Sequence, residues 1–64
     1  MNIILNGKAT FFTARTLADL IAETAPQKPF AAAVNTVFVP KSRYETTLLQ
    51  ENDQVEIVRP VVGG

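Results

Sequence analysis

Side chains that usually carry out chemistry are scarce in this sequence of 64 residues. It contains neither His nor Cys, so the commonest general base, the commonest metal ligand and a thiolate nucleophile are all missing. Ser42, Arg43 and Tyr44 stand together, but no base accompanies the two hydroxyls. Glu51 and Asp53 flank one residue, and two carboxylates in a turn make a poor metal site. We therefore expect no catalytic residue, no metal and no bound cofactor.

The last five residues, Pro60-Val61-Val62-Gly63-Gly64, are the most distinctive feature. Pro60 lacks an N–H and should end the final strand. The four residues after it can span at most about 14 Å, and their only charge is a terminal carboxylate. Because Gly63 and Gly64 have no Cβ, we expect a thin arm that passes through channels closed to side chains. A bare Gly-Gly end is often only a frayed terminus, but here it closes a compact domain.

Length and composition limit the class of protein. A chain of 64 residues is one small domain, and 47% of its residues are apolar. Six basic residues balance six acidic ones, which argues against disorder and against binding nucleic acid by phosphate neutralisation. The sequence shows no apolar run of the roughly 20 residues that span a membrane, and its first residues do not resemble a signal peptide. The expected location is the cytoplasm.

The chain begins with a predicted hairpin. Residues 1–5 are apolar, and Asn6-Gly7 is the pair that best tolerates a positive φ at both central positions of a type I′ turn. Residues 8–12 would form the returning strand. This register places Ile4 and Phe11 on one face and the neighbouring apolar residues on the other.

A short amphipathic helix is predicted next. Thr16 can act as its N-cap, and Asp19 stands where a capping box needs its acidic partner. Leu17 and Leu20 recur at helical spacing, and the prolines that follow end the element.

Three more strands are predicted, at residues 30–34, 37–39 and 54–59. Asn35-Thr36 joins the first two, although residues 31–33 could instead extend a helix. With the first and last strands parallel neighbours, the result is an α+β, ubiquitin-like β-grasp fold. It would have a mixed sheet of four to five strands, one main helix on one face and an extended Gly-Gly tail. Residues 1–64 form the single domain, with an ordered body at about 1–59 and a flexible tail at 60–64.

The whole chain resembles the ThiS-type sulfur carriers of thiamine biosynthesis. The resemblance rests on Asn6-Gly7, on residues 33–35 (AVN) and 38–42 (FVPKS), on residues 49–58 (LQENDQVEIV), and on Gly63-Gly64. One departure is Asn52, where the family often has Gly. Asn is the best substitute at a positive φ, so the turn should survive.

The resemblance implies a protein co-substrate and not an enzyme. An E1-like adenylating enzyme of the ThiF type would use ATP to join AMP to the Gly64 carboxylate. A sulfur donor such as a cysteine desulfurase would convert the adenylate into a thiocarboxylate, and a thiazole synthase of the ThiG type would take the sulfur. Val61, Val62 and Gly63 would thread into these partners, and we expect no nucleic acid or membrane among them.

A partner surface is predicted beside this tail. Ile4, Phe11 and Val58 fall on the sheet face away from the helix and could form an exposed apolar patch. Arg59 could add an ion pair with an acidic partner. Single exposed apolar residues and a solvated Arg are also ordinary at a surface.

Two other functions remain open. The related sulfur carrier of molybdopterin synthesis shares the fold and the Gly-Gly end, although such proteins tend to be longer. A β-grasp protein-binding module whose tail has no covalent role is the alternative from another class, and it would keep its function without Gly63 and Gly64.

Overall fold

Five strands, one helix and one 3₁₀ turn follow one another in the part of the chain that the structure describes. The computed structural model describes residues 1–27 and 29–59. Its elements are β1 (Asn2–Leu5), β2 (Lys8–Phe11), α1 (Leu17–Thr24), β3 (Ala31–Val34), β4 (Val37–Val39), η1 (Lys41–Arg43) and β5 (Gln54–Val58).

The first hairpin has the predicted turn and register. Leu5 lies opposite Lys8, and the antiparallel pairing runs back to Asn2 and Phe11. Asn6 has a φ of 50° and Gly7 a φ of 82°, which is the left-handed backbone that a type I′ turn requires. The hairpin prediction is therefore confirmed.

The helix α1 begins with the predicted capping box. The Asp19 N–H donates to the Thr16 hydroxyl at 3.1 Å, and the Thr16 N–H donates to the Asp19 carboxylate at 3.3 Å. The helix ends when Ala25 enters the left-handed region with a φ of 46°, while its N–H still donates to the Ile21 carbonyl. Pro26 then prevents continuation.

The second hairpin joins β3 and β4 in antiparallel register, with Val34 opposite Val37. The alternative in which residues 31–33 extend a helix is wrong, because these residues pair with strands on both sides. Both turn residues have a positive φ, 50° at Asn35 and 71° at Thr36. Asn tolerates this backbone, whereas a β-branched residue rarely adopts it.

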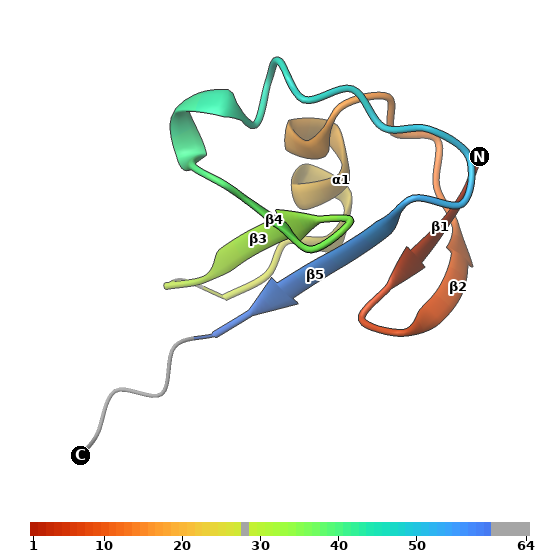
Figure 1. Ribbon diagram of the computed structural model, residues 1–64, viewed down its shortest axis with the longest axis horizontal. Helices are drawn as coiled ribbons and strands as arrows, with labels where there is room; N and C mark the ends of the chain where they lie inside the picture. Colours follow the sequence, from red (N-terminus) through yellow and green to blue (C-terminus); the bar gives the residue numbers. More distant parts are fainter. Residues whose placement is uncertain (28, 60–64) are drawn as a thin grey trace.

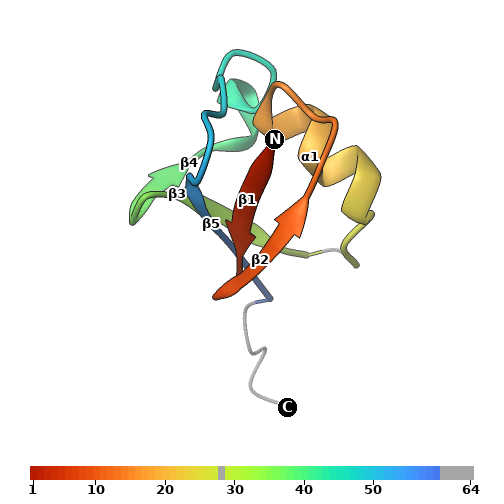
Figure 2. The ribbon, with the colours of Figure 1, turned by 90° about the vertical axis from the view of Figure 1, so that its right-hand side faces the viewer.

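The strands form one mixed sheet in the order β2-β1-β5-β3-β4 (Figures 1 and 2). β5 lies in the centre, parallel to β1 and antiparallel to β3. The helix packs across one face of the sheet, which confirms the β-grasp arrangement expected from the sequence.

The core lies between this sheet and the helix. Ile3, Leu17, Leu20 and Val55 are completely buried, because each points into the layer between the two elements. Tyr44 is half-buried and stacks on Phe30, with ring centroids 6.3 Å apart and planes 14° from parallel. Among the residues described, no helix has the length and apolar character needed to cross a membrane.

Candidate functional site

The strand β5 leads to the predicted functional end of the chain. Val55 is buried on the helix face, and the open face of the strand carries Gln54, Glu56 and Val58. Val58 pairs with Ala31, so β5 is held by β3 up to its last residue. Figure 1 shows β5, in blue, running from the middle of the sheet to the side where the described chain ends.

The predicted functional tail lies outside the described residues. Val61, Val62, Gly63 and Gly64 belong to that segment, and so does the flexible tail expected at 60–64. Their threading into partners and the modification of Gly64 stay predictions.

The apolar residues predicted as a partner surface share the face opposite α1. Ile4 alternates with the buried Ile3 and is half-buried, whereas Phe11 and Val58 are 67% and 53% exposed. Arg59, which follows β5, is also exposed. That these residues contact a partner stays a prediction.

The pairing registers separate these residues along the face. Ile4 lies opposite Gln54, so Val58 is four residues, or about 13 Å, further along β5. Phe11 lies opposite Asn2, beyond Ile4 in the other direction. The fold therefore leaves Val58 and Arg59 at the end where the chain leaves the sheet, with Phe11 at the far end.

A residue that the sequence prediction missed lies on the same face, nearer this end than Phe11. Phe38 of the edge strand β4 lies opposite Ala33, which lies opposite Glu56 of β5, so all three share the open face. Phe38 is 65% exposed. We call the apolar residues Ala31, Ala33, Phe38 and Val58 the exit patch. The alternation of residues 37–39 could have identified Phe38 only once the register of β4 on β3 was known.

The carboxylates of Glu51 and Asp53, just before β5, accept hydrogen bonds from backbone N–H groups. The Glu51 carboxylate accepts from the Asn2 N–H at 3.0 Å, and the Asp53 carboxylate accepts from the Gln50 N–H at 2.8 Å. Within residues 1–27 and 29–59, no group of three or more acidic side chains could hold a metal ion. The Asp53 carboxylate stabilises the turn before β5, as a local side-chain hydrogen bond does. The Glu51 carboxylate instead ties this turn to the start of β1.

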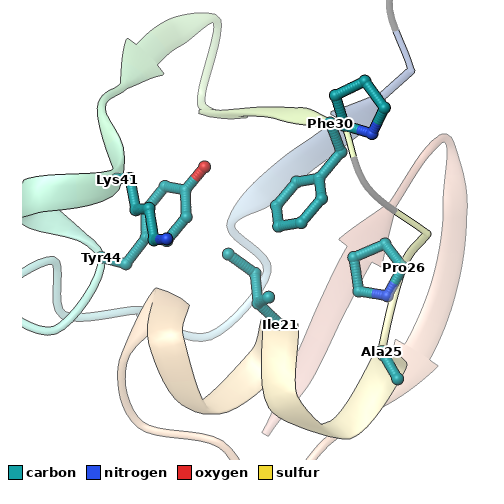
Figure 3. Close-up of a pocket in the computed structure, with 7 residues that line it drawn as sticks. Ile21, Ala25, Pro26, Phe30, Lys41 and Tyr44 are labelled. Carbon is teal, nitrogen blue, oxygen red and sulfur yellow. The ribbon is translucent and has the colours of Figure 1, made fainter.

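An apolar pocket of about 500 Å³ opens on the other side of the molecule, between the end of α1 and η1. Figure 3 shows Ile21, Phe30 and Tyr44 projecting toward a common hollow, with Lys41 at its border. Its lining offers a cation and a phenol but no acid–base pair, so the pocket gives no reason to assign catalysis.

The fold defines the class of protein. A mixed five-stranded sheet with a central parallel pair, two flanking hairpins and a single helix on one face is a ubiquitin-like β-grasp domain. The model of the ThiS family matches residues 3–64, and the chain belongs to this family.

Solved structures support the fold. The chain is similar to the crystal structure of a thiamine biosynthesis protein (ThiS) from Geobacter metallireducens, with a TM-score of 0.87, 19% identity and full coverage of both chains. It is also similar to an NMR solution structure of a thiamine biosynthesis protein from the same organism, with a TM-score of 0.79 and 19% identity. That match covers all of this chain and 88% of the other. No curated protein matches the sequence significantly.

Proposed function

We propose that the protein carries sulfur for thiazole formation in thiamine biosynthesis, as a thiocarboxylate on Gly64. Membership of the ThiS family supports the coarser role, that of a small sulfur carrier in thiamine biosynthesis. The observation that carries the proposal is the extent of the family match, which runs from residue 3 through the terminal Gly63-Gly64.

The chemistry explains why such a chain needs partners. A free carboxylate is resonance-stabilised and offers no good leaving group, so sulfur cannot replace its oxygen directly. An E1-like adenylating enzyme would transfer AMP from ATP to the Gly64 carboxylate and release pyrophosphate. Sulfur at the oxidation level of sulfide, HS⁻, would then attack the acyl carbon and displace AMP, which leaves a thiocarboxylate. The carrier supplies only the carboxylate, and its partners supply the catalytic groups and ATP.

The form of the carrier suits delivery of sulfur to a thiazole synthase. Val61, Val62 and Gly63 would enter the partner together with Gly64, while the folded body remains outside. Binding the body holds the reactive end at a high local concentration, which makes the transfer effectively intramolecular.

The open sheet face is the surface that we assign to these partners. Ile4, Phe11, Val58 and Arg59 belong to it, and Phe38 extends it across β4. At the exit patch a partner would meet exposed apolar side chains beside the start of the tail, with the exposed Glu56 next to them. This arrangement fits an apolar protein surface that carries a cation opposite Glu56 and an acidic group opposite Arg59.

Intact mass spectrometry tests the proposal. The purified chain is incubated with a ThiF-type adenylating enzyme, ATP and a sulfur source. Replacement of one carboxylate oxygen by sulfur should add about 16 Da, the difference between the two atomic masses, at the acyl group. A variant that ends at Val62 should gain nothing. An unchanged mass in the full chain, under conditions that modify a known carrier, would overturn the proposal.

A further inference from the structure

The central strand β5 donates a backbone hydrogen bond to a side chain of each hairpin turn. Asn6 and Asn35 occupy the same place in their turns, and both have a φ of 50°. In each case the side-chain carbonyl accepts from a backbone N–H of β5. The two asparagines thus do more than adopt a left-handed backbone.

At the exit end, Asn6 extends the ladder between β1 and β5. The Ile4 N–H donates to the Asp53 carbonyl and the Asn6 N–H to the Val55 carbonyl, both at 2.9 Å. Parallel ladders use every second residue, so the next donor is the Ile57 N–H and its regular acceptor would be the Asn6 carbonyl. The chain turns away at Asn6, and its side-chain Oδ1 accepts from Ile57 instead, at 2.9 Å.

At the entry end, Asn35 does the same for the ladder between β3 and β5. The Asn35 N–H donates to the Gln54 carbonyl at 2.6 Å, and the Gln54 N–H donates to Asn35 Oδ1 at 3.0 Å. The amide Nδ2 also donates to Asp53 Oδ1 at 3.1 Å. Asn35 therefore binds β5 at Gln54, the first residue of the strand and three residues before Ile57.

The bond from Asn6 decides how far β5 is held on both sides. The pairing of β1 with β5 ends at Leu5 and Val55, whereas that of β3 with β5 continues to Val58. Without Asn6, the segment from Glu56 onward would be bound only along β3. A strand bound along one side twists and frays more readily than one bound along both.

We propose that Asn6 is a positioning residue for the functional tail. Its side chain fixes the direction in which the chain leaves the sheet after Ile57, and so presents the Gly64 carboxylate to the adenylating enzyme. This inference rests on the proposed function. Asn35, which holds the other end of the same strand, serves only the fold.

The test compares Asn6→Gly with Asn35→Gly. Glycine keeps the positive φ in both turns and removes the side-chain acceptor. We expect Asn6→Gly to speed amide hydrogen exchange of Ile57 about tenfold relative to global unfolding, and to raise the KM of the chain for adenylation at least about threefold. The kcat should stay unchanged, because the enzyme itself holds the tail once it is bound.

Matched variants separate positioning from stability. Asn35→Gly removes two side-chain hydrogen bonds and should destabilise the fold at least as much, but leave the KM and the relative exchange of Ile57 unchanged. Asn6→Asp keeps an acceptor oxygen and should restore both values. If Asn6→Gly loses protection at Ile57 while the KM stays at the unmodified value, or if Asn35→Gly raises the KM equally, the inference is wrong.

Two further outcomes keep this test distinct from that of the function. Should Asn6→Gly not fold, the exchange of Ile57 in the unmodified chain still decides whether the bond forms, since a free amide would exchange as fast as that of an open loop. Absence of adenylation in the unmodified chain would overturn the proposed function, whereas the exchange data would still decide the bond itself.

Discussion

At the scale of single residues, Asp19 organises the start of the helix. Its carboxylate accepts from the backbone N–H groups of Thr16 and Arg15, at 3.3 and 3.4 Å. These hydrogen bonds, first that from Thr16, hold the pKa of the Asp19 carboxyl below its ordinary value of 3.8. Each bond favours the charged form, which is the form that the capping box requires.

The lowered pKa gives the fold an acid-sensitive component. The contribution of Asp19 to stability is complete above pH 3.8 and is lost as the pH falls through the lower pKa of the folded state. We expect Asp19→Asn to lower the Tm at pH 7 and to reduce the drop in Tm between pH 7 and pH 2.

Thermal unfolding at several pH values measures this effect. Glu45→Gln, which removes an exposed carboxylate outside α1, is the matched control and should keep the full drop. An Asp19→Asn variant with the same acid sensitivity as the unmodified chain would contradict the assignment.

At the scale of elements, the two hairpin turns have similar backbone conformations but differ in their second residue. Gly7 has a φ of 82° and an added Cβ would meet nothing within 4 Å. Thr36 has a φ of 71°, in a region where a β-branched side chain crowds its own backbone. The second turn therefore holds strain that the first avoids.

Substitution of Thr36 and of Gly7 should reveal the strain. We expect Thr36→Gly to raise the free energy of unfolding by about 1 kcal/mol, because glycine enters this region without steric cost. Gly7→Ala should lower it by about 1 kcal/mol through the backbone alone. Denaturant unfolding measures both changes, and destabilisation by Thr36→Gly would show that the threonine side chain stabilises the turn.

At the scale of the whole molecule, the two faces of the sheet differ. The helix covers one face, and the other exposes large apolar side chains. Val58 lies at the exit end, Phe11 at the far end, and Phe38 level with Glu56 between them. Phe38 and Val58 lie nearer than Phe11 to the end where the described chain leaves the sheet.

This asymmetry predicts unequal effects on binding. Phe38→Ser should weaken binding to the adenylating enzyme about tenfold or more, as loss of a central apolar contact does. Phe11→Ser, an equally exposed Phe far from the exit, should weaken it less than about threefold. Both should leave the Tm nearly unchanged, because neither side chain is in the core. Calorimetric titration measures the affinities, and equal losses would extend the contact over the whole face.

Much of the fold follows from local chemistry that can be recognised in the sequence. Asn6-Gly7 specifies its turn because few residue pairs accept two positive φ angles, and Thr16 with Asp19 specifies the start of the helix. The parallel pairing of the first and last strands follows from general rules for connecting strands through a helix.

Other features depend on contacts between distant segments and could not be predicted. The hydrogen bond from the Ile57 N–H to the Asn6 side chain joins residues 51 apart in sequence and needs the register of β5 on β1. The exposure of Phe38 depends on the register of β4 on β3, and the backbone of Thr36 on the tightness of that hairpin. The Gly-Gly tail was predicted from the sequence alone, and it lies outside the described residues.

The central position of β5 has a consequence for biosynthesis. The strand that fills the middle of the sheet comes last in the chain order, and its Val55 completes the core. During synthesis on the ribosome, the two hairpins and the helix are made before the strand that joins them. The body can thus close only after residues 54–58 have emerged, so an incomplete chain cannot yet present the finished face of the sheet.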